Sequence, residues 1–265
     1  MLPHVISRVW AARAARRACA LAVTAVLGGC GLRGSGPLGE GAPAGFTEPS
    51  TGMEFLRVTG GTLVWGPPSG DARAPAGRPA EVSVPGFYLG RTEVTQAQWR
   101  TVMGSVPSWF RGDRRPVDQV SWDDAREFAR RLSDRSGRRF RLPAEAEWEY
   151  AARSGGRDET WPGTADRATV GELAWFRENS GGGSREVRGL RPNGLGFHDM
   201  GGNVWEWCDD RYLPAGPGAP DDEHRVLRGG SWDDTLERVT ATYRLRFVRS
   251  WVGRTVGFRL AADTR

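Results

Sequence analysis

The feature that most limits how this chain can fold is its wealth of tryptophan in a sequence otherwise full of turn residues. The 265 residues include 12 tryptophans, 37 glycines and 17 prolines, and every tryptophan except Trp10 lies after residue 30. Each indole can bury roughly 150–250 Å², whereas closely spaced Gly and Pro interrupt helices and strands. The chain can therefore build a substantial aromatic core with little regular secondary structure around it.

A basic and then apolar segment opens the chain. Arginines at positions 8, 13, 16 and 17 precede the apolar run 20–27, and Gly28-Gly29-Cys30 follow. The run is too short to span a bilayer, which takes about 20 residues, and the pattern is typical of a secretory signal peptide. The stretch LGGC also resembles a bacterial lipobox. We expect a lipoprotein signal peptide over 1–29, lipidation of Cys30 and a lipid-anchored protein of the bacterial cell envelope; an ordinary signal peptide cut elsewhere is the alternative.

Charge and cysteine content exclude several classes of function. Removing the four arginines of this leader lowers the formal net charge from +5 to +1, so the clustered basic surface of a nucleic-acid-binding protein is not indicated. Cys19 leaves with the leader and Cys30 would carry lipid, so Cys208 remains alone. A single thiol forms neither an internal disulfide nor a zinc site of several thiolates.

Beyond the leader, composition separates a tether from one folded domain. Residues 30–50 are rich in Gly and Pro and read as a flexible tether, and we place the domain at 51–265. Apolar patterns predict short strands within 53–66, 82–94, 224–232 and 253–262. Capping and periodicity predict helices that begin after Thr95 and after Ser121, the second ending at Gly137, and a third with Pro143 in its first turn. The expected class is α+β with long loops.

Seven motifs occur in a fixed order along this domain: TGGTLVWG, FYLGRTEVTQAQW, PVDQVSWDDAREFARRLS, RLPAEAEWEYAAR, DMGGNVWEWCDD, VLRGGSW and GFRLA. Together they resemble the formylglycine-generating enzyme (sulfatase-modifying factor) family, and the resemblance runs from Met53 to Ala262. It implies that family's irregular α+β fold, a variant of the C-type lectin fold with low regular secondary structure.

The resemblance also implies a structural calcium site in DMGGNVWE. Calcium prefers carboxylate and carbonyl oxygens supplied by tight, Gly-rich loops. The matching positions are Asp199, Gly202, Val204 and Glu206; two solvated acids on a turn are the simpler alternative. Trp205 and Trp207 share a face if this stretch is extended. We expect Trp207 in the core and, from the family, Trp205 beside the ligand cleft.

The enzymes of this family use two cysteines after the GGS motif to bind copper(I) and oxidise a substrate cysteine. Here those positions are Asp234 and Val239. A carboxylate is too hard an oxygen ligand for copper(I) and valine is no ligand, so copper is not expected. Cys208 lies in another motif and reads as a small buried hydrophobe. We find no nucleophile paired with a base.

What remains is a candidate binding cleft for a peptide, protein or glycan. Aromatic side chains beside arginines suit stacking and paired hydrogen bonds. The resemblance places the cleft at Trp205, Ser231, Trp232, Asp233, Asp234, Tyr243, Arg244, Arg246, Phe247 and Trp251, and we expect RLRFVRSWVGR to be an exposed loop. The expected function is a membrane-anchored ligand-binding or scaffold module of the cell envelope. The alternative is an oxidase of protein substrates with a non-standard site.

Overall fold

The computed structural model describes residues 45–65, 81–212 and 222–264, all within one compact unit, 41–265. Cys30 and the predicted leader lie outside the described residues. The helices are α1 (Gln96–Met103), α2 (Trp122–Ser136), α3 (Glu145–Ala152) and the 3-10 turn η1 (Arg167–Glu172). The strands are β1 (Gly45–Thr47), β2 (Glu54–Val58), β3 (Gly61–Val64), β4 (Glu81–Val84), β5 (Phe87–Gly90), β6 (Phe140–Arg141), β7 (Ala174–Trp175), β8 (Gly201–Gly202), β9 (Trp205–Arg211), β10 (His224–Arg228), β11 (Arg244–Val248), β12 (Val256–Gly257) and β13 (Ala261–Asp263).

The first two helices begin where local capping chemistry predicts. Thr95 caps α1 and Ser121 caps α2, each in a reciprocal capping box with the side chain three residues later. Gly137 ends α2 in the left-handed conformation, with φ 72°. The apolar side of α2 is buried from Trp122 to Leu132. These boundaries agree with the predicted ones.

Helix α3 starts later than predicted. Pro143 lies before the helix, Ala144 is its N-cap, and the first helical residue is Glu145. The Glu147 carboxylate accepts the Ala144 N–H at 2.8 Å and the Arg141 guanidinium at 2.6 and 2.7 Å. This side chain therefore caps the helix end and ties it to β6, which fixes the start two residues beyond the proline.

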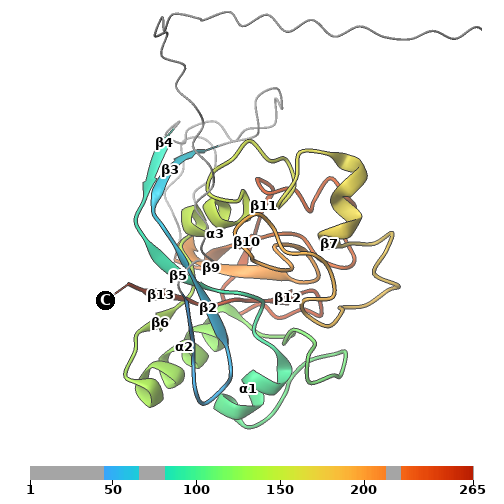
Figure 1. Ribbon diagram of the computed structural model, residues 1–265. Helices are drawn as coiled ribbons and strands as arrows, with labels where there is room; N and C mark the ends of the chain where they lie inside the picture. The colour runs from blue at the N-terminus through green and yellow to red at the C-terminus, as the bar shows by residue number, and fades with distance from the viewer. Residues whose placement is uncertain (1–44, 66–80, 213–221, 265) are drawn as a thin grey trace, which may run out of the picture. The chain divides into compact units, whose positions relative to one another are not determined.

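Two sheets organise the elements around the helices. The five-stranded sheet has the order β1-β2-β5-β13-β6, so the last strand of the chain lies between early strands (Figure 1). The four-stranded sheet has the order β11-β10-β9-β12, in which only the β12–β9 pair is parallel. The predicted α+β class with short elements is confirmed, and the pairing of β12 with β9 places the start of the GFRLA motif beside DMGGNVWEW.

Two segments fold where the sequence predicted none. Residues Gly45–Thr47 of the expected tether pair with β2 as strand β1, so the folded part begins before residue 51. RLRFV, expected in an exposed loop, forms β11 and pairs along its whole length with β10. That prediction of a loop is wrong because the strand is stabilised by a neighbour 20 residues earlier, which local composition does not reveal.

The core is aromatic and consists of two large clusters and a small third one. One cluster contains Trp99, Trp122, Trp205 and Trp207 with residues of α1 and α2. The second is built around Trp148, which is completely buried. Strand β9 contributes to both, since Trp207 packs in the first and Cys208 in the second. The high tryptophan content therefore serves the core, as the sequence indicates for Trp207.

Candidate functional site

The DMGGN turn has a backbone that few sequences can adopt. Asp199, Gly202 and Asn203 all have positive φ, at 56°, 73° and 54°. A Cβ atom on Gly202 would lie 1.8 Å from the carbonyl oxygen of Trp175, so only glycine fits this position. The turn thereby holds Asp199 just before β8 and leads into β9, which carries Glu206.

Glu206 forms a buried ion pair across the molecule. Arg259 donates to both of its carboxylate oxygens at 2.6 Å, and Trp148 Nε1 donates to Oε2 at 2.7 Å. Glu206 and Arg259 are 1% and 0% exposed. Arg259 also donates to the carbonyl oxygens of Gly90 and His198. One guanidinium therefore connects the closing GFRLA segment, β5 and the DMGGN turn.

Two further carboxylates are buried beside this pair. Glu93 accepts the Val204 N–H at 3.1 Å and the Asn203 amide at 2.7 Å. Asp199 accepts the Arg188 N–H through Oδ2 at 2.8 Å. Its other oxygen, Oδ1, is buried and has no hydrogen-bond partner in the described structure. An unpaired buried oxygen of this kind costs free energy unless a ligand, ion or water completes it.

The charges of this cluster do not balance. The carboxylates of Glu93, Asp199 and Glu206 lie near the single guanidinium of Arg259, and all four residues are at most 2% exposed. If all are ionised, the cluster has a formal charge of −2. Burial raises the pKa of Asp199 to about 6, and burial together with the charges of Asp199 and Glu206 holds the pKa of Glu93 well above its ordinary value. Protonation or one divalent cation would restore the balance.

A cation at this cluster would have to be held partly by the backbone. Among the described residues, no three His, Cys, Asp or Glu side chains are arranged to hold a metal ion. The four positions that the resemblance implies comprise only two carboxylates, with the backbone of Gly202 and Val204 supplying the rest. The free Asp199 oxygen and the excess negative charge suit Ca²⁺ in donor type, while both Glu206 oxygens already carry hydrogen bonds.

Sequence reasoning missed two members of the cluster, Glu93 and Arg259. Arg259 is the single charge of the apolar stretch GFRLA, whereas Glu93 follows Arg91 in RTEV and has no such isolation. A lone charge in a buried strand-like segment requires a partner, and this was the available signal for Arg259. Arg259 pairs with Glu206, 53 positions earlier, and Glu93 accepts from Asn203, 110 positions later, so no local pattern identifies these contacts.

Asp234 and Val239, which occupy the family's thiol positions, are both buried. Asp234 accepts hydrogen bonds from Trp205 Nε1 at 2.8 Å and from the Ser231 hydroxyl. Arg238 pairs with its other oxygen at 3.3 Å. Val239 is 0% exposed and packs in a small apolar cluster. Asp234 thus anchors an indole, while Val239 fills core space.

Cys208 is enclosed in the second core cluster. It is 0% exposed, and burial holds the pKa of its thiol well above the ordinary value. A thiol must ionise to act as a nucleophile or to bind copper(I). Its surroundings are those of an inert packing residue.

The ten predicted cleft residues divide between buried and accessible positions. Trp205, Ser231, Trp232 and Asp234 are buried, and Arg246 is exposed. Those that are partly exposed are Asp233, Tyr243, Arg244, Phe247 and Trp251.

Aromatic contacts hold the cleft residues in two groups. Trp205 lies 5.9 Å from Tyr243 between ring centroids, and Phe247 stacks on Trp251 at 4.1 Å. Trp109, which sequence reasoning did not select, is the most exposed of the large hydrophobic side chains, at 63%. It precedes Phe110, whose ring packs edge-on against Trp232.

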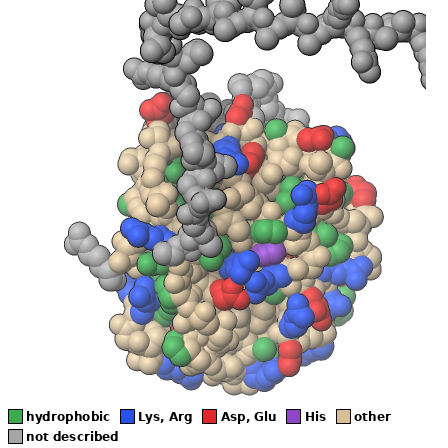
Figure 2. Space-filling model, viewed as in Figure 1, with side chains coloured by type: hydrophobic (Ala, Val, Ile, Leu, Met, Phe, Trp, Pro, Cys, Tyr) green, Lys and Arg blue, Asp and Glu red, His purple; other side chains and the backbone are tan. Residues whose placement is uncertain are grey.

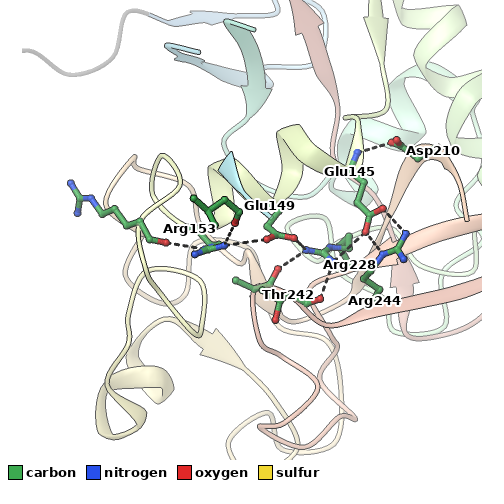
Figure 3. A network of polar contacts seen from close by, with 10 residues as sticks. Glu145, Glu149, Arg153, Asp210, Arg228, Thr242 and Arg244 are labelled. Atoms are coloured by element: carbon green, nitrogen blue, oxygen red, sulfur yellow. Dashed lines mark hydrogen bonds and ion pairs between the residues drawn. The ribbon is translucent and has the colours of Figure 1, made fainter. Parts of the chain in front are cut away.

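One predicted cleft residue, Arg244, belongs to a buried charge network (Figure 3). Its guanidinium binds Glu145 of α3 at 2.5 and 2.8 Å. Arg228 pairs with the same Glu145 at 3.2 Å and also with Glu149 at 2.5 Å. The Asp210 carboxylate accepts the Glu145 N–H at 2.6 Å. The network fixes β10 and β11 to α3, so Arg244 supports the site instead of standing free in it.

The charged side chains on the drawn face are mixed in sign, with arginines and acids interspersed (Figure 2). This distribution differs from the single-sign surface typical of nucleic-acid binding. Within residues 45–65, 81–212 and 222–264, no helix is both long and apolar enough to span a membrane.

Three curated relatives align with most of the chain. It is 28% identical to the chaperone protein LppX of Paenibacillus barcinonensis, over 68% of this chain and 81% of that protein. It is 35% identical to the formylglycine-generating enzyme of Streptomyces coelicolor, over 64% of this chain and 60% of that enzyme. It is 34% identical to the inactive C-alpha-formylglycine-generating enzyme 2 of Mus musculus, over 64% of this chain and 56% of that protein.

The fold is shared with a solved structure, Treponema denticola variable protein 1. The TM-score is 0.73 at 29% sequence identity, covering 83% of this chain and 98% of that one. The sequence pattern of the family described as "Sulfatase-modifying factor enzyme 1-like domain" matches residues 43–264. The fold class inferred from the seven motifs is confirmed. The chain belongs to the sulfatase-modifying factor enzyme 1-like domain family, which its formylglycine-generating relatives also represent.

Proposed function

We propose that this protein is a non-catalytic member of its family, anchored by lipid at Cys30 to a bacterial envelope membrane, where it binds a peptide or protein ligand. The observation that carries the proposal is the environment of Asp234. This carboxylate stands at a thiol position of the family's enzymes but holds Trp205 and Ser231 by hydrogen bonds. Copper(I) chemistry through two thiolates has no counterpart at Asp234 and Val239.

The relatives support a binding role. One relative carries the name of a chaperone and another is named as inactive, so loss of the oxidase chemistry with retention of the fold has precedent among them. A chaperone acts by binding other proteins, and the partly exposed Phe247 and Trp251 offer aromatic surface for such contact. The envelope location rests on the LGGC leader.

We infer that Ca²⁺ stabilises the domain at the DMGGN turn. Asp199 and Glu206 would contribute carboxylate oxygens, and Gly202 and Val204 backbone carbonyls. The bound cation would supply positive charge next to three buried carboxylates. Support comes from the unpartnered Asp199 oxygen and from the formal charge of −2. In this role the metal shapes the fold and takes part in no reaction.

The direct test is a conversion assay. The purified domain is incubated with copper, a reductant and a peptide that contains Cys-x-Pro-x-Arg, and the peptide mass is followed. We expect an unchanged mass and no stoichiometric copper or iron in the protein. Formation of an aldehyde from the peptide cysteine would overturn the non-catalytic assignment, and its loss in Cys208→Ser would make that thiol the catalytic group.

A further inference from the structure

Strand β11 forms an open edge of the four-stranded sheet. Within the described part of the chain, it pairs only with β10. The Arg249 N–H donates to the Glu223 carbonyl at 2.6 Å. This bond shows which residues of β11 direct their backbone groups towards β10. Because antiparallel residue pairs alternate between hydrogen-bonded and non-hydrogen-bonded ones, the N–H and C=O groups of Arg244, Arg246 and Val248 point away from β10. Among these groups, the Val248 C=O accepts the Trp251 N–H at 2.9 Å.

The two faces of β11 differ in chemistry. Leu245 and Phe247 pack against the first core cluster, and Phe247 stacks on Trp251. Arg244, Arg246 and Val248 lie on the opposite face because side chains alternate along a strand. A ligand strand beside β11 would therefore meet an apolar row on one face and arginines on the other.

Arg246 is the side chain on this edge whose charge is accessible to a ligand. It is exposed, and its guanidinium lies 5.2 Å from the ring centroid of Tyr212. None of the ion pairs recorded among the described residues involves it, whereas Arg244 on the same face is held by Glu145. A carboxylate on an incoming strand could reach Arg246 without breaking an existing ion pair.

We propose that β11 binds an extended segment of a partner protein as an added antiparallel strand. Acidic residues of that segment would lie beside Arg246, and apolar residues between them would extend the row of Leu245 and Phe247. Main-chain hydrogen bonds would give affinity and the alternating side chains specificity. The inference rests on the proposed binding function and names the partner as an acidic, alternating strand.

Charge argues against a second copy of this chain as the occupant. Strand β11 contains two arginines, Arg244 and Arg246, and no acid. Two β11 edges paired antiparallel would bring arginines of both copies to neighbouring positions, and like charges opposite each other are destabilising. Charged edge strands are a common protection against self-pairing. An acidic strand removes this repulsion and satisfies the open edge.

The test uses a capped peptide in which Glu and Val alternate, with a Lys-Val peptide as its counterpart. Val248→Pro is the informative variant. Proline removes the outward N–H of an edge residue and leaves the ladder to β10 intact. Val248→Ala is the matched control for the lost side chain, and circular dichroism checks that both variants are folded.

We expect the Glu-Val peptide to bind the wild type and Val248→Ala, and to protect the amides of residues 244, 246 and 248 from hydrogen exchange. Val248→Pro should weaken binding at least tenfold, and Arg246→Glu should reverse the preference in favour of the Lys-Val peptide. Absence of binding by the wild type, or equal binding by Val248→Pro, would overturn the proposal. Self-association that Val248→Pro abolishes would identify a second copy as the occupant and overturn it too. These outcomes leave the conversion assay unaffected, so the two proposals fail separately.

Discussion

At the scale of single residues, Asp118 is a buried acid that holds an exposed aromatic loop. It is 0% exposed, and its Oδ1 accepts the Trp109 N–H at 2.7 Å. Its Oδ2 has no hydrogen-bond partner in the described structure. Burial raises the pKa of Asp118 from 3.8 to about 6, against the lowering effect of the Trp109 and Phe110 N–H groups. The folded protein therefore binds this proton more tightly than the unfolded chain.

This shift predicts that Asp118 costs stability at neutral pH. Because the folded pKa is the higher one, the contribution of Asp118 to the free energy of unfolding is largest below pH 3.8 and falls as pH rises through 6, by at most about 3 kcal/mol. Asp118→Asn keeps an acceptor for Trp109 but does not titrate. Urea unfolding at pH 4.5 and 7.5 should show the variant gaining stability relative to the wild type at the higher pH. Parallel pH profiles for the two proteins would contradict this assignment.

At the scale of elements, the buried network connects α3 to the four-stranded sheet. Arg228 on β10 is 0% exposed and pairs with Glu145 and Glu149 of α3. It also donates to the carbonyl oxygens of Ala241 and Thr242. A single guanidinium thus satisfies groups from three segments, and burial already raises the pKa of Glu149. The helix position depends on this pairing.

Removing the centre of that network should be costly. Arg228→Met keeps most of the side-chain volume but removes the guanidinium that the two buried carboxylates share, so that Glu145 keeps Arg244 and Glu149 keeps Arg153. We expect a loss of about 3–5 kcal/mol in unfolding free energy. Arg130→Met is the matched control, because Arg130 pairs with Glu127 and Asp134 on the exposed surface of α2 and its loss should matter far less. Denaturant unfolding measures both. Equal losses of unfolding free energy in the two variants would show that the buried network stabilises the fold no more than a surface ion pair does.

At this scale, the sequence predicts an element when the residues that stabilise it lie close together in the chain. The starts of α1 and α2 follow from Thr95 and Ser121, whose partners lie three residues away. Strand β11 was mistaken for a loop because its stability comes from β10. The Glu93–Arg259 cluster was missed because its members come together only in the folded chain. The motif order identified the fold despite these errors.

At the scale of the whole molecule, the leader predicts where the protein is found. Cys30 follows LGG at the end of a basic and apolar segment, and acyl chains attached there would hold the protein to a membrane by burying their methylene groups. The full chain should fractionate with membranes, and Cys30→Ala should move to the soluble fraction. A wild-type protein that is soluble and begins at another residue would contradict lipidation. Cys208→Ala is the matched control, since its thiol is buried and its location should not change.

Calcium would act on the same scale, because its proposed site in DMGGNVWE lies beside buried charges from opposite ends of the domain. Glu93 precedes α1, Asp199 opens the DMGGN turn, Glu206 follows it on β9, and Arg259 precedes β13. An ion that binds only the folded state adds about 2.7 kcal/mol at 100 times its dissociation constant. For a domain of this size, that corresponds to a rise of roughly 5–10 °C in Tm. Chelation should lower Tm by this amount and calcium should restore it.

The calcium test needs a variant that changes calcium binding without destabilising the fold when calcium is absent. Glu206→Ala would leave Arg259 buried without its partner, so it would destabilise the fold with or without calcium. Asp199→Asn is sharper, because it removes a charge from a group whose Oδ1 has no partner and relieves the excess negative charge of the cluster. We expect this variant to be at least as stable as the chelated wild type and to gain little from calcium. Equal calcium-induced shifts in Tm for the variant and the wild type would place the ion elsewhere, and no shift in either would leave the cluster balanced by protons alone.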